Sequence, residues 1–383
     1  MNTPRIFRCD VPARAVADLH ERIERARWPD QINDGAWSYG ADLNYLRELV
    51  DYWRHDFDWP RAQAELNGFS QFLLAIDGLD IHFIHQRSPH ASATPLLITH
   101  GWPGSIVEFM DLIPRLTEPE KFGGRVADAF HVIAPSLPGY GFSPAAREPG
   151  MHTHKVAERH VRLMAELGYS SYIAQGGDWG ASISRSTAAI DPQHCRGVHL
   201  NLVAVGPPKD VPDPLALATP DERKLLERAA RHQHEGAAYM QLHSTKPQSL
   251  GYGLYDSPLG LCAWITEKFH DWSDCRGDIR NAISWDRLLT NISLYWYTNS
   301  IVSSLRLYKE TQVARGRNAP QQPVKVPFGA AVYPYDIYHT PRAWVERKFD
   351  VRHWFVAETG GHFAAMEQPQ TFAEDLWRFK HVC

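Results

Sequence analysis

Short apolar runs, each followed by a glycine-rich turn, dominate the middle of the chain. The runs are Pro95–Thr99, His131–Ala134 and Tyr172–Ala174, and the turns read HGWPGS, PGYGFS and GGDWGAS. Helical patterns lie between most of the runs. Continuous apolar strands that alternate with helices are typical of a mostly parallel sheet covered on both faces. We therefore expect an α/β fold in which the three turns meet at one edge of the sheet.

Further strand patterns lie on both sides of this region. The runs Gln71–Ile76 and Leu79–His85 are joined by Asp77-Gly78, a dipeptide that strongly indicates a β-hairpin. Strand patterns follow again at three places: Gly197–Val203, Val324–Val332 and Val351–Val356. Together these runs predict a sheet core made of two parts, residues 69–205 and 319–383.

The residues before the hairpin read as helical. Apolar residues recur every three or four positions over residues 10–27, and further helical patterns cover about 42–55 and 60–67. A helix with one apolar face must lie on something larger. We therefore expect residues 1–68 to form an amino-terminal helical arm.

A second helical region interrupts the strand patterns. Residues 206–220 contain five prolines, and Thr219-Pro220-Asp221-Glu222 then has the features of a helix start. The next hundred residues are helical in pattern and include a long helix from about 286 to 311. We predict that residues 206–318 form a helical lid over the carboxyl ends of the strands, where such sheets bind ligands.

Composition excludes several classes of protein. The net charge is −4 and no basic tail is present, so nucleic-acid binding has little support. Five scattered cysteines are typical of a reducing compartment rather than of a disulfide framework or a zinc site. No signal-peptide pattern and no apolar run of 18 residues is present. We expect a cytoplasmic protein without a membrane anchor.

The turn after Tyr172–Ala174 has the form G-x-D-x-G, with Asp178 at its centre. A related turn, G-x-S-x-G, presents a serine nucleophile between a strand and a helix. The loop after the earlier strand, His100 to Ser105, occupies the position that supplies a second N–H to an oxyanion hole in that architecture. The sequence therefore predicts that Asp178 lies where a nucleophile is expected.

A histidine and an acid should complete such a site. His362, within GGHF after the last strand pattern, has the position of the catalytic histidine in this order of elements. Asp336, in YPYD after the preceding strand pattern, is the favoured acid. Asp210 and Asp213, which follow the earlier strand pattern, are the competing candidates.

With these motifs the chain resembles an epoxide hydrolase of the microsomal type, within the α/β-hydrolase superfamily. The resemblance spans nearly the whole length and rests on Arg-Trp-Pro in the arm, HGWPGS, GGDWG, the lid, YPYD and GGHFAAMEQP. It implies Asp178 as the nucleophile and Asp336 with His362 as the charge-relay pair. The chain departs from the animal enzymes of this family in two respects. Asp336 stands where they often have glutamate, which should preserve the role of the acid. They also begin with a membrane anchor, which we do not expect in this protein.

The resemblance also implies two lid tyrosines that hold the epoxide oxygen. Matching by motif gives Tyr239, in AAYMQLHSTKP, and Tyr308, in SSLRLYKE. The chain has 15 tyrosines, and Tyr295 and Tyr297 also lie in the lid, so residue type alone does not select the pair.

An aspartate nucleophile suits a strained ether because, unlike serine, it is ionised at neutral pH. It can attack an epoxide carbon and form an alkyl-enzyme ester, which a water activated by the histidine then hydrolyses to a diol. The backbone N–H groups of Trp102 and Trp179 are expected to form the oxyanion hole, and Trp102, Pro103 and Trp179 to contact the substrate. This chemistry needs no metal and no cofactor.

Three other functions are alternatives to epoxide hydrolysis. A haloalkane dehalogenase uses the same Asp and His chemistry, and a non-catalytic relative would bind a hydrophobic ligand under its lid. A serine esterase is disfavoured because the turn lacks serine. Thirteen tryptophans fit either a large core or an aromatic cavity for a bulky or aryl epoxide. The role would be detoxification or natural-product biosynthesis, and the arm would support a homodimer.

Overall fold

Within the residues that the computed structural model describes, 3–316 and 323–383, nine strands form one sheet in the order β1-β2-β3-β5-β4-β6-β7-β8-β9. The neighbours from β5 to β9 pair in parallel, whereas β1, β2, β3 and β5 pair antiparallel. The predicted mostly parallel sheet is thus confirmed. The strand bounds are β1 (Arg5–Phe7), β2 (Gln71–Ile76), β3 (Leu79–Gln86), β4 (Thr94–Thr99), β5 (Phe130–Pro135), β6 (Tyr172–Gly176), β7 (Cys195–Leu200), β8 (Phe328–Val332) and β9 (Val351–Val356).

The predicted hairpin joins β2 to β3. Ile76 pairs with Leu79 across the turn, and the two turn residues both have positive φ, 51° at Asp77 and 76° at Gly78. Such angles belong to the type I′ turn, whose twist matches that of the two strands. The Asp-Gly dipeptide therefore sets the register of this pair.

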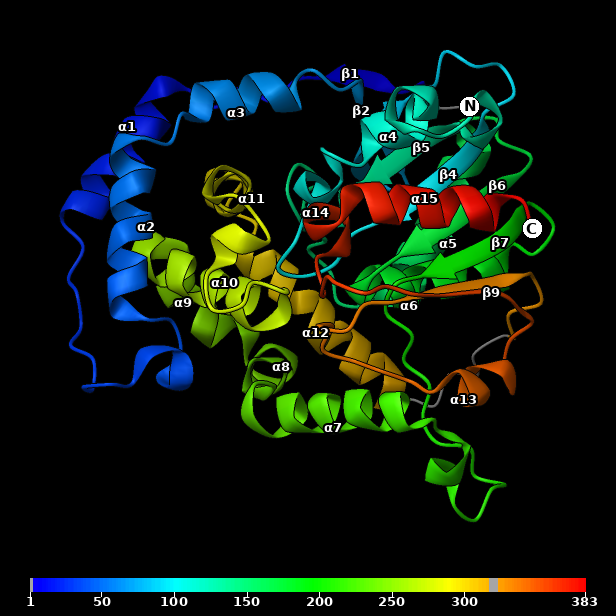
Figure 1. Cartoon of the computed structure of the whole chain (residues 1–383). Coiled ribbons are helices and arrows are strands. Elements are labelled where there is room, and N and C mark those ends of the chain that lie inside the picture. Colours follow the sequence, from blue (N-terminus) through cyan, green and yellow to red (C-terminus); the bar gives the residue numbers. More distant parts are fainter. Residues whose placement is uncertain (1–2, 317–322) are drawn as a thin grey trace.

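Helices cover both faces of the sheet. Figure 1 shows α4 (Ile113–Thr117) and α15 (Pro369–Lys380) across one face. Apolar residues of α5 (Thr153–Glu166), α6 (Asp178–Ile190) and α13 (Arg342–Glu346) join a second buried cluster on the other face. The short α14 (Ala364–Glu367) precedes α15. Burial on both faces explains why the central strands read as continuous apolar runs.

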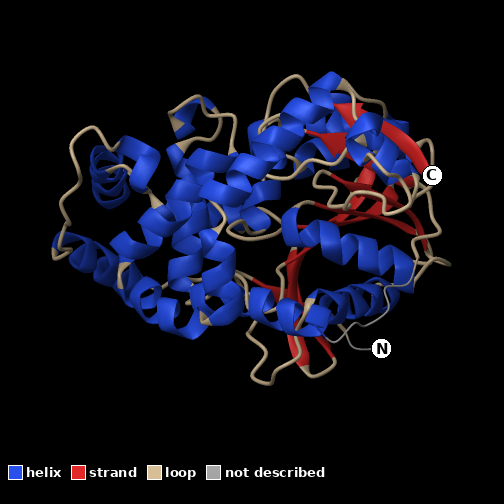
Figure 2. Cartoon of the chain, turned by 90° about the horizontal axis from the view of Figure 1, so that it is seen from below, coloured by secondary structure: helices blue, strands red, loops and turns tan. Residues whose placement is uncertain are grey.

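The lid is inserted between β7 and β8, and Figure 2 shows this helical half beside the half that contains the strands. Thr219 and Glu222 form the predicted capping box at the start of α7. The predicted end of the lid at residue 318 lies outside the described residues. The helices are α7 (Pro220–Glu235), α8 (Ala238–Thr245), α9 (Pro247–Asp256), α10 (Pro258–Trp272), α11 (Trp285–Tyr297) and α12 (Ile301–Gly316).

The single long helix predicted from about 286 to 311 is wrong, because two helices, α11 and α12, occupy this stretch. Asn299 lies between them with φ of 54°, in the left-handed region that asparagine tolerates better than most residues. The side chain of Thr298 donates a hydrogen bond to the Leu294 carbonyl at the end of α11, at 2.6 Å. The chain therefore turns between two helices whose apolar patterns run on without a visible gap.

Two strand predictions were too long. β8 begins at Phe328 instead of Val324 because Pro327 has no N–H to donate to a ladder, and the Phe328 N–H donates to the Asp350 carbonyl at 2.9 Å. β7 ends at Leu200 instead of Val203. The Val203 carbonyl accepts a hydrogen bond from the Thr340 hydroxyl at 2.6 Å, outside the sheet.

The amino-terminal arm contains α1 (Ala13–Glu24), α2 (Leu43–His55) and α3 (Trp59–Leu66), which pack on lid helices α10 and α11 (Figure 1). It is not purely helical, because β1 forms the edge strand beside β2. Trp53 of α2 donates its indole N–H to the hydroxyl of Ser293 in α11 at 2.9 Å. No helix in the described part of the chain combines the length and the apolar character needed to cross a membrane.

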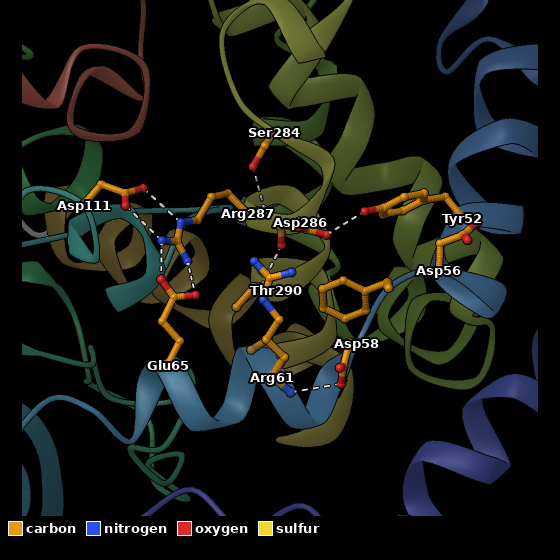
Figure 3. Close-up of a pocket in the computed structure, with 12 residues that line it drawn as sticks. Tyr52, Asp56, Asp58, Arg61, Glu65, Asp111, Ser284, Asp286, Arg287 and Thr290 are labelled. Carbon is orange, nitrogen blue, oxygen red and sulfur yellow. Dashed lines mark hydrogen bonds and ion pairs between the residues drawn. The ribbon is translucent and has the colours of Figure 1, made fainter.

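Arm, lid and core meet at Arg287 of α11 (Figure 3). Its guanidinium donates to Glu65 of α3 at 2.8 Å and to Asp111, just before α4, at 2.9 Å. Nearby, the Tyr52 hydroxyl donates to Asp286 at 2.8 Å. These polar groups line a cavity of about 330 Å³ that is separate from the three glycine-rich turns. The junction therefore links three segments that are far apart in the sequence.

Candidate active site

Asp178 lies at the sharp turn from β6 into α6. Its φ is 49°, a left-handed conformation that is rare for a residue with a side chain. The start of α6 packs so closely on β4 that a Cβ at Gly180 would overlap the carbonyl of Thr99. Close packing therefore requires glycine at position 180. The turn holds the Asp178 carboxylate at the carboxyl end of the parallel strands.

The loop after β4 faces this carboxylate. The Trp102 N–H donates to Asp178 Oδ1 at 2.8 Å, and a side chain at Gly101 would overlap the Asp178 carboxyl group. Trp179 is the second residue of α6, where backbone N–H groups have no acceptor within the helix. The structure thus places one N–H donor, that of Trp102, on Asp178 Oδ1, and the N–H of Trp179 in the first turn of α6.

His362 and Asp336 are brought together beside Asp178. His362 Nδ1 lies 2.7 Å from Asp336 Oδ1, and Nε2 lies 3.5 Å from Asp178 Oδ2. The exposed fraction of the side chain is 4% for His362 and 2% for Asp336, so water barely screens the pair. The competing acids lie elsewhere: Asp210 pairs with Arg347, and Asp213 accepts the Leu215 N–H at 3.1 Å.

The charge on His362 is set by two carboxylates. Burial, the largest single influence, disfavours the charged imidazole. Asp336 and Asp178 together outweigh burial and raise the pKa of His362 from 6.5 to about 10. In the free protein the ring is therefore an imidazolium at neutral pH, held between two anions. Any change that neutralises Asp178 removes part of that support.

Tyr239 of α8 and Tyr308 of α12 line the same cavity as Asp178, and both are buried. Their ring centroids are 6.0 Å apart, and the Tyr308 ring packs against Trp179 at 4.7 Å. Burial, together with the negative charge of Asp178, holds the pKa of both phenols well above the usual value. Among the described residues, the Tyr308 hydroxyl has no hydrogen-bond partner. Both phenols stay protonated and can donate.

The other two lid tyrosines are engaged elsewhere. The Tyr295 hydroxyl donates to the Gly104 carbonyl at 2.7 Å, and so supports the loop after β4 from behind. The Tyr297 ring packs on Trp59 of the arm, with centroids 4.7 Å apart. Tyr239 and Tyr308 line the cavity beside Asp178, whereas Tyr295 and Tyr297 do not. The structure therefore distinguishes the two tyrosines selected by motif from the other two in the lid.

A cavity of about 360 Å³ connects these groups. Asp178, Trp179, Tyr239 and Tyr308 line it, and most of the remaining wall is apolar. Trp102 is completely buried and stacks on Tyr239 at 5.5 Å instead of lining this cavity. Pro103 also lies outside the described lining residues, and its carbonyl accepts a hydrogen bond from Asn291. Of the three residues that were expected to contact the substrate, Trp179 lines this cavity, whereas Trp102 and Pro103 do not.

Sequence reasoning missed the residues that hold the His362 loop. The Trp272 carbonyl accepts the His362 N–H at 2.8 Å. Glu367 accepts the N–H groups of Phe363 at 3.0 Å and of Asp274 at 2.8 Å. Burial raises the pKa of the Glu367 carboxyl to about 8. Glu367 stands in GGHFAAMEQP, but nothing in that string indicates that it bridges to the lid.

Two buried ionisable groups near the site were also missed. Glu108 lies so close to Gly104 that a Cβ there would overlap its carboxyl group, and burial raises the pKa of Glu108 to about 8. The Lys268 ammonium lies 4.8 Å from the ring centre of Tyr239 and is also buried. Their positions depend on how lid and core pack together, which no local motif reports.

Comparisons with known proteins identify the family and the fold. Residues 4–109 match the family described as epoxide hydrolase N terminus, and residues 94–246 match the alpha/beta hydrolase fold. A protein of Stigmatella aurantiaca, named provisionally as an epoxide hydrolase, is 44% identical over 97% of this chain and 83% of its own length. Epoxide hydrolase 1 of Oryctolagus cuniculus is 37% identical over 98% and 88%. The crystal structure of juvenile hormone epoxide hydrolase from the silkworm Bombyx mori superposes with a TM-score of 0.91 at 32% identity, covering 100% of this chain and 95% of that one.

Proposed function

The chain belongs to the epoxide hydrolase family, and from this premise we propose that it hydrolyses an epoxide to a vicinal diol through an ester at Asp178. One observation carries the proposal: two protonated phenols, of Tyr239 and Tyr308, line the same cavity as a carboxylate that is paired with a buried histidine. An epoxide needs an attack on carbon and a proton donor for its oxygen, and the residues that line this cavity include groups of both kinds.

In the first step an oxygen of Asp178 attacks an epoxide carbon. Because the Trp102 N–H binds Oδ1, Oδ2 is the oxygen left for attack. The new C–O bond forms as the ring C–O bond breaks, and the oxygen that is released takes a proton from Tyr239 or Tyr308. The two donors share the charge that develops on this oxygen, in a site from which water is largely excluded.

The second step hydrolyses the ester. Alkylation neutralises Asp178 and so removes one of the two anions that raise the pKa of His362. His362 gives up its extra proton, which restores the phenol that donated in the first step. The neutral imidazole, oriented by Asp336, then takes a proton from water, and the hydroxide attacks Cγ of Asp178. The oxyanion forms on Oδ1, held by the Trp102 N–H. The Cγ–Oδ2 bond then breaks, and Oδ2 leaves with the substrate carbon as the second hydroxyl of the diol, taking its proton from the His362 imidazolium. The oxygen of the water stays in the Asp178 carboxyl group, whose proton returns to His362.

Isotope labelling tests this route. In a single turnover in ¹⁸O-labelled water with enzyme in excess, the label is expected in Asp178 and not in the diol, since water attacks the ester carbonyl. Peptide mass spectrometry locates the label. Label in the diol after the first turnover would instead mean that water attacks the epoxide directly, and the ester route would be wrong.

Haloalkane dehalogenation is the second candidate. The indole N–H groups of Trp102 and Trp179 are buried without a partner among the described residues, and such donors suit a halide ion. Only Trp179 lines the cavity, however, and the two phenols would have no task in releasing halide. A panel of epoxides and chloroalkanes separates the two activities: we expect diol without halide release, and halide release alone would support the alternative.

The lining of the cavity favours a bulky apolar substrate. Its wall includes side chains without polar groups from the core and the lid, among them Leu200, Val203, Met240 and Phe349. Burying the body of an apolar epoxide against them supplies binding free energy of roughly 25 cal/mol per Å² of apolar surface. Substrate class is therefore set by the wall as much as by the reacting groups.

A further inference from the structure

A buried lysine of α10, Lys268, lies beside the active-site cavity without forming part of its wall. Its side chain is 5% exposed, and it is not among the described residues that line the cavity. The ammonium lies 4.8 Å from the ring centre of Tyr239, 5.3 Å from that of Trp264 and 6.0 Å from that of Trp272. A cation is attracted to the face of an aromatic ring, most strongly where water is excluded. Three rings therefore hold a positive charge next to one of the two phenols of the site.

The ion-pair partner of Lys268 is its neighbour in the chain, Glu267. The two members of this pair affect Tyr239 in opposite senses. Burial, the charge of Asp178 and then that of Glu267 raise the pKa of the Tyr239 phenol. A positive charge near the same phenol favours its ionised form. Removing the cation and removing the anion are therefore expected to have opposite effects on how readily Tyr239 gives up its proton.

Two histidines pack against the same group of rings. His243 accepts the Trp264 N–H at 3.3 Å, and the ring of His232 lies 5.9 Å from that of Trp272. Burial, and then the charge of Lys268, lower the pKa of His243 to about 3. Burial is also the largest influence that lowers the pKa of His232 to about 4. Both imidazoles are therefore uncharged at neutral pH and add no cation to that of Lys268.

Resting on the proposed function, we propose that Lys268 is a positioning residue for the first step: its ammonium orients the ring of Tyr239 and stabilises the phenolate that remains when Tyr239 gives its proton to the epoxide oxygen. As Asp178 attacks, the ring C–O bond breaks, and the released oxygen takes the phenol proton. Negative charge thus passes from the carboxylate to the phenolate beside Lys268. The phenolate later takes its proton back from His362, so no outside acid is needed. Tyr308 remains the second hydrogen-bond donor.

The first test removes the charge. Lys268→Met keeps a side chain of similar length, and the full-length variant is mixed with saturating epoxide, quenched at short times and analysed by intact-protein mass spectrometry. Ester formation on Asp178 is expected to slow about tenfold, whereas hydrolysis of the ester should keep its rate. Lys268→Arg restores a cation and should recover most of the loss. Lys224→Met is the matched control, because Lys224 is an exposed lid lysine that is paired with Asp221.

A double-mutant cycle tests whether Lys268 acts through Tyr239. In the Tyr239→Phe background no phenolate can form at this position, so adding Lys268→Met should change the rate of ester formation by less than about twofold. A lysine that only supports the packing of α10 would slow ester formation equally in both backgrounds.

The partner of the lysine gives an independent test. Glu267→Gln removes the anion that opposes the phenolate, so this variant should form the ester at least as fast as the wild type. Loss of an ion pair with a purely structural role would slow the reaction instead, as Lys268→Met does. Glu267→Gln therefore tests the proposal even if Lys268→Met does not fold.

The outcomes separate the two proposals. The role of Lys268 is wrong if Lys268→Met forms the ester at the wild-type rate, if it slows Tyr239→Phe as much as it slows the wild type, or if Glu267→Gln slows ester formation. In each of these cases the epoxide hydrolase remains. If the wild-type protein forms neither an ester nor a diol from any epoxide, the proposed function itself is wrong.

Discussion

The two oxygens of the Asp178 carboxylate have different neighbours. Oδ1 accepts the Trp102 N–H at 2.8 Å, whereas Oδ2 lies 3.5 Å from His362 Nε2. In the proposed mechanism Oδ1 is the oxygen held by the Trp102 N–H, and Oδ2 is the oxygen that attacks the epoxide. We therefore expect His362 to be required for hydrolysis of the ester but not for its formation.

Replacing His362 with Gln should separate the two steps. We expect the variant to form the ester on Asp178 and then to stall, because loss of a general base slows its step by roughly 10²–10⁴-fold. Intact-protein mass spectrometry after mixing with an epoxide should show one added substrate mass. Asp178→Ala is the control and should show no added mass. Steady turnover by His362→Gln would contradict the assignment of the base.

The pH dependence of the second step follows from the same contacts. In the free protein the pKa of His362 is raised to about 10 by Asp336 and Asp178 against the effect of burial. Alkylation removes the Asp178 charge, so the pKa in the ester should be lower, and the neutral base should be populated at lower pH. Ester hydrolysis, followed by quenched flow, should rise with pH through an apparent pKa below 10. A midpoint at or above 10 would contradict this coupling.

The two phenols should contribute to the first step. Tyr308→Phe and Tyr239→Phe are each expected to slow ester formation by roughly a hundredfold, since each removes a donor to the developing oxyanion. Tyr297→Phe is the control, because its ring packs on Trp59 in the same lid and away from the cavity. Stopped-flow tryptophan fluorescence reports ester formation. Equal rates for Tyr308→Phe and Tyr297→Phe would show that the proton comes from elsewhere.

At the residue scale, sequence indicated the groups that sit on turns and missed those held by packing. Asp178, Asp336 and His362 each follow a strand pattern, and the order of strands places such residues at one edge of the sheet. No such rule locates Tyr239 or Tyr308 among 15 tyrosines, because their hydroxyls reach the site through the packing of lid helices. Their selection depended on resemblance to known proteins.

At the scale of elements, apolar periodicity found helices and strands but not their ends. The break between α11 and α12 falls in a region where buried residues continue on both sides. What ends α11 is the conformation of Asn299, together with a hydrogen bond from the Thr298 side chain. Local backbone geometry of this kind leaves no periodic signal, because asparagine also occurs within helices.

The break can be tested through Asn299. A left-handed backbone costs a residue with a Cβ roughly 1–2 kcal/mol, and branching at Cβ adds to the strain. Asn299→Gly is therefore expected to leave the free energy of unfolding nearly unchanged, whereas Asn299→Val should lower it by about 1–2 kcal/mol. Urea denaturation of both variants gives the difference. If Val and Gly were equally stable at this position, the left-handed turn would not be what separates the helices.

At the scale of the whole molecule, arm, lid and core are joined by contacts between distant parts of the chain. Arg287 of the lid pairs with Glu65, 222 residues earlier, and with Asp111, 176 residues earlier. The sequence predicted the three segments from their patterns. It could not predict this junction, since an ion pair between distant residues depends on the completed fold. Arg287 lies near the start of α11. Further along the same helix, the side chains of Asn291 and Tyr295 donate hydrogen bonds to backbone carbonyls of the loop after β4.

Removing this cation should loosen the junction. The exposed fraction of the side chain is 18% for Arg287 but 46% for Glu65 and 42% for Asp111, so solvent screens the acids and limits the gain from each pair. Burial disfavours the Arg287 charge, but Glu65 and Asp111 outweigh burial and raise its pKa, so it remains charged over the whole working range. We expect Arg287→Gln to lower the free energy of unfolding by about 1–2 kcal/mol, because it leaves two carboxylates facing each other.

Salt distinguishes an electrostatic junction from simple packing. The difference between wild type and Arg287→Gln should shrink in 1 M salt, where charges are screened within about 3 Å. Arg280→Gln is the matched control, since Arg280 is a more exposed lid arginine whose ion pair is with Asp278, two residues away. Its effect on unfolding should stay within about 0.5 kcal/mol. If Arg287→Gln behaved like Arg280→Gln in urea denaturation at low salt, the arm would be held by its apolar contacts alone, and the bridging cation would have no part in fixing the lid over the cavity.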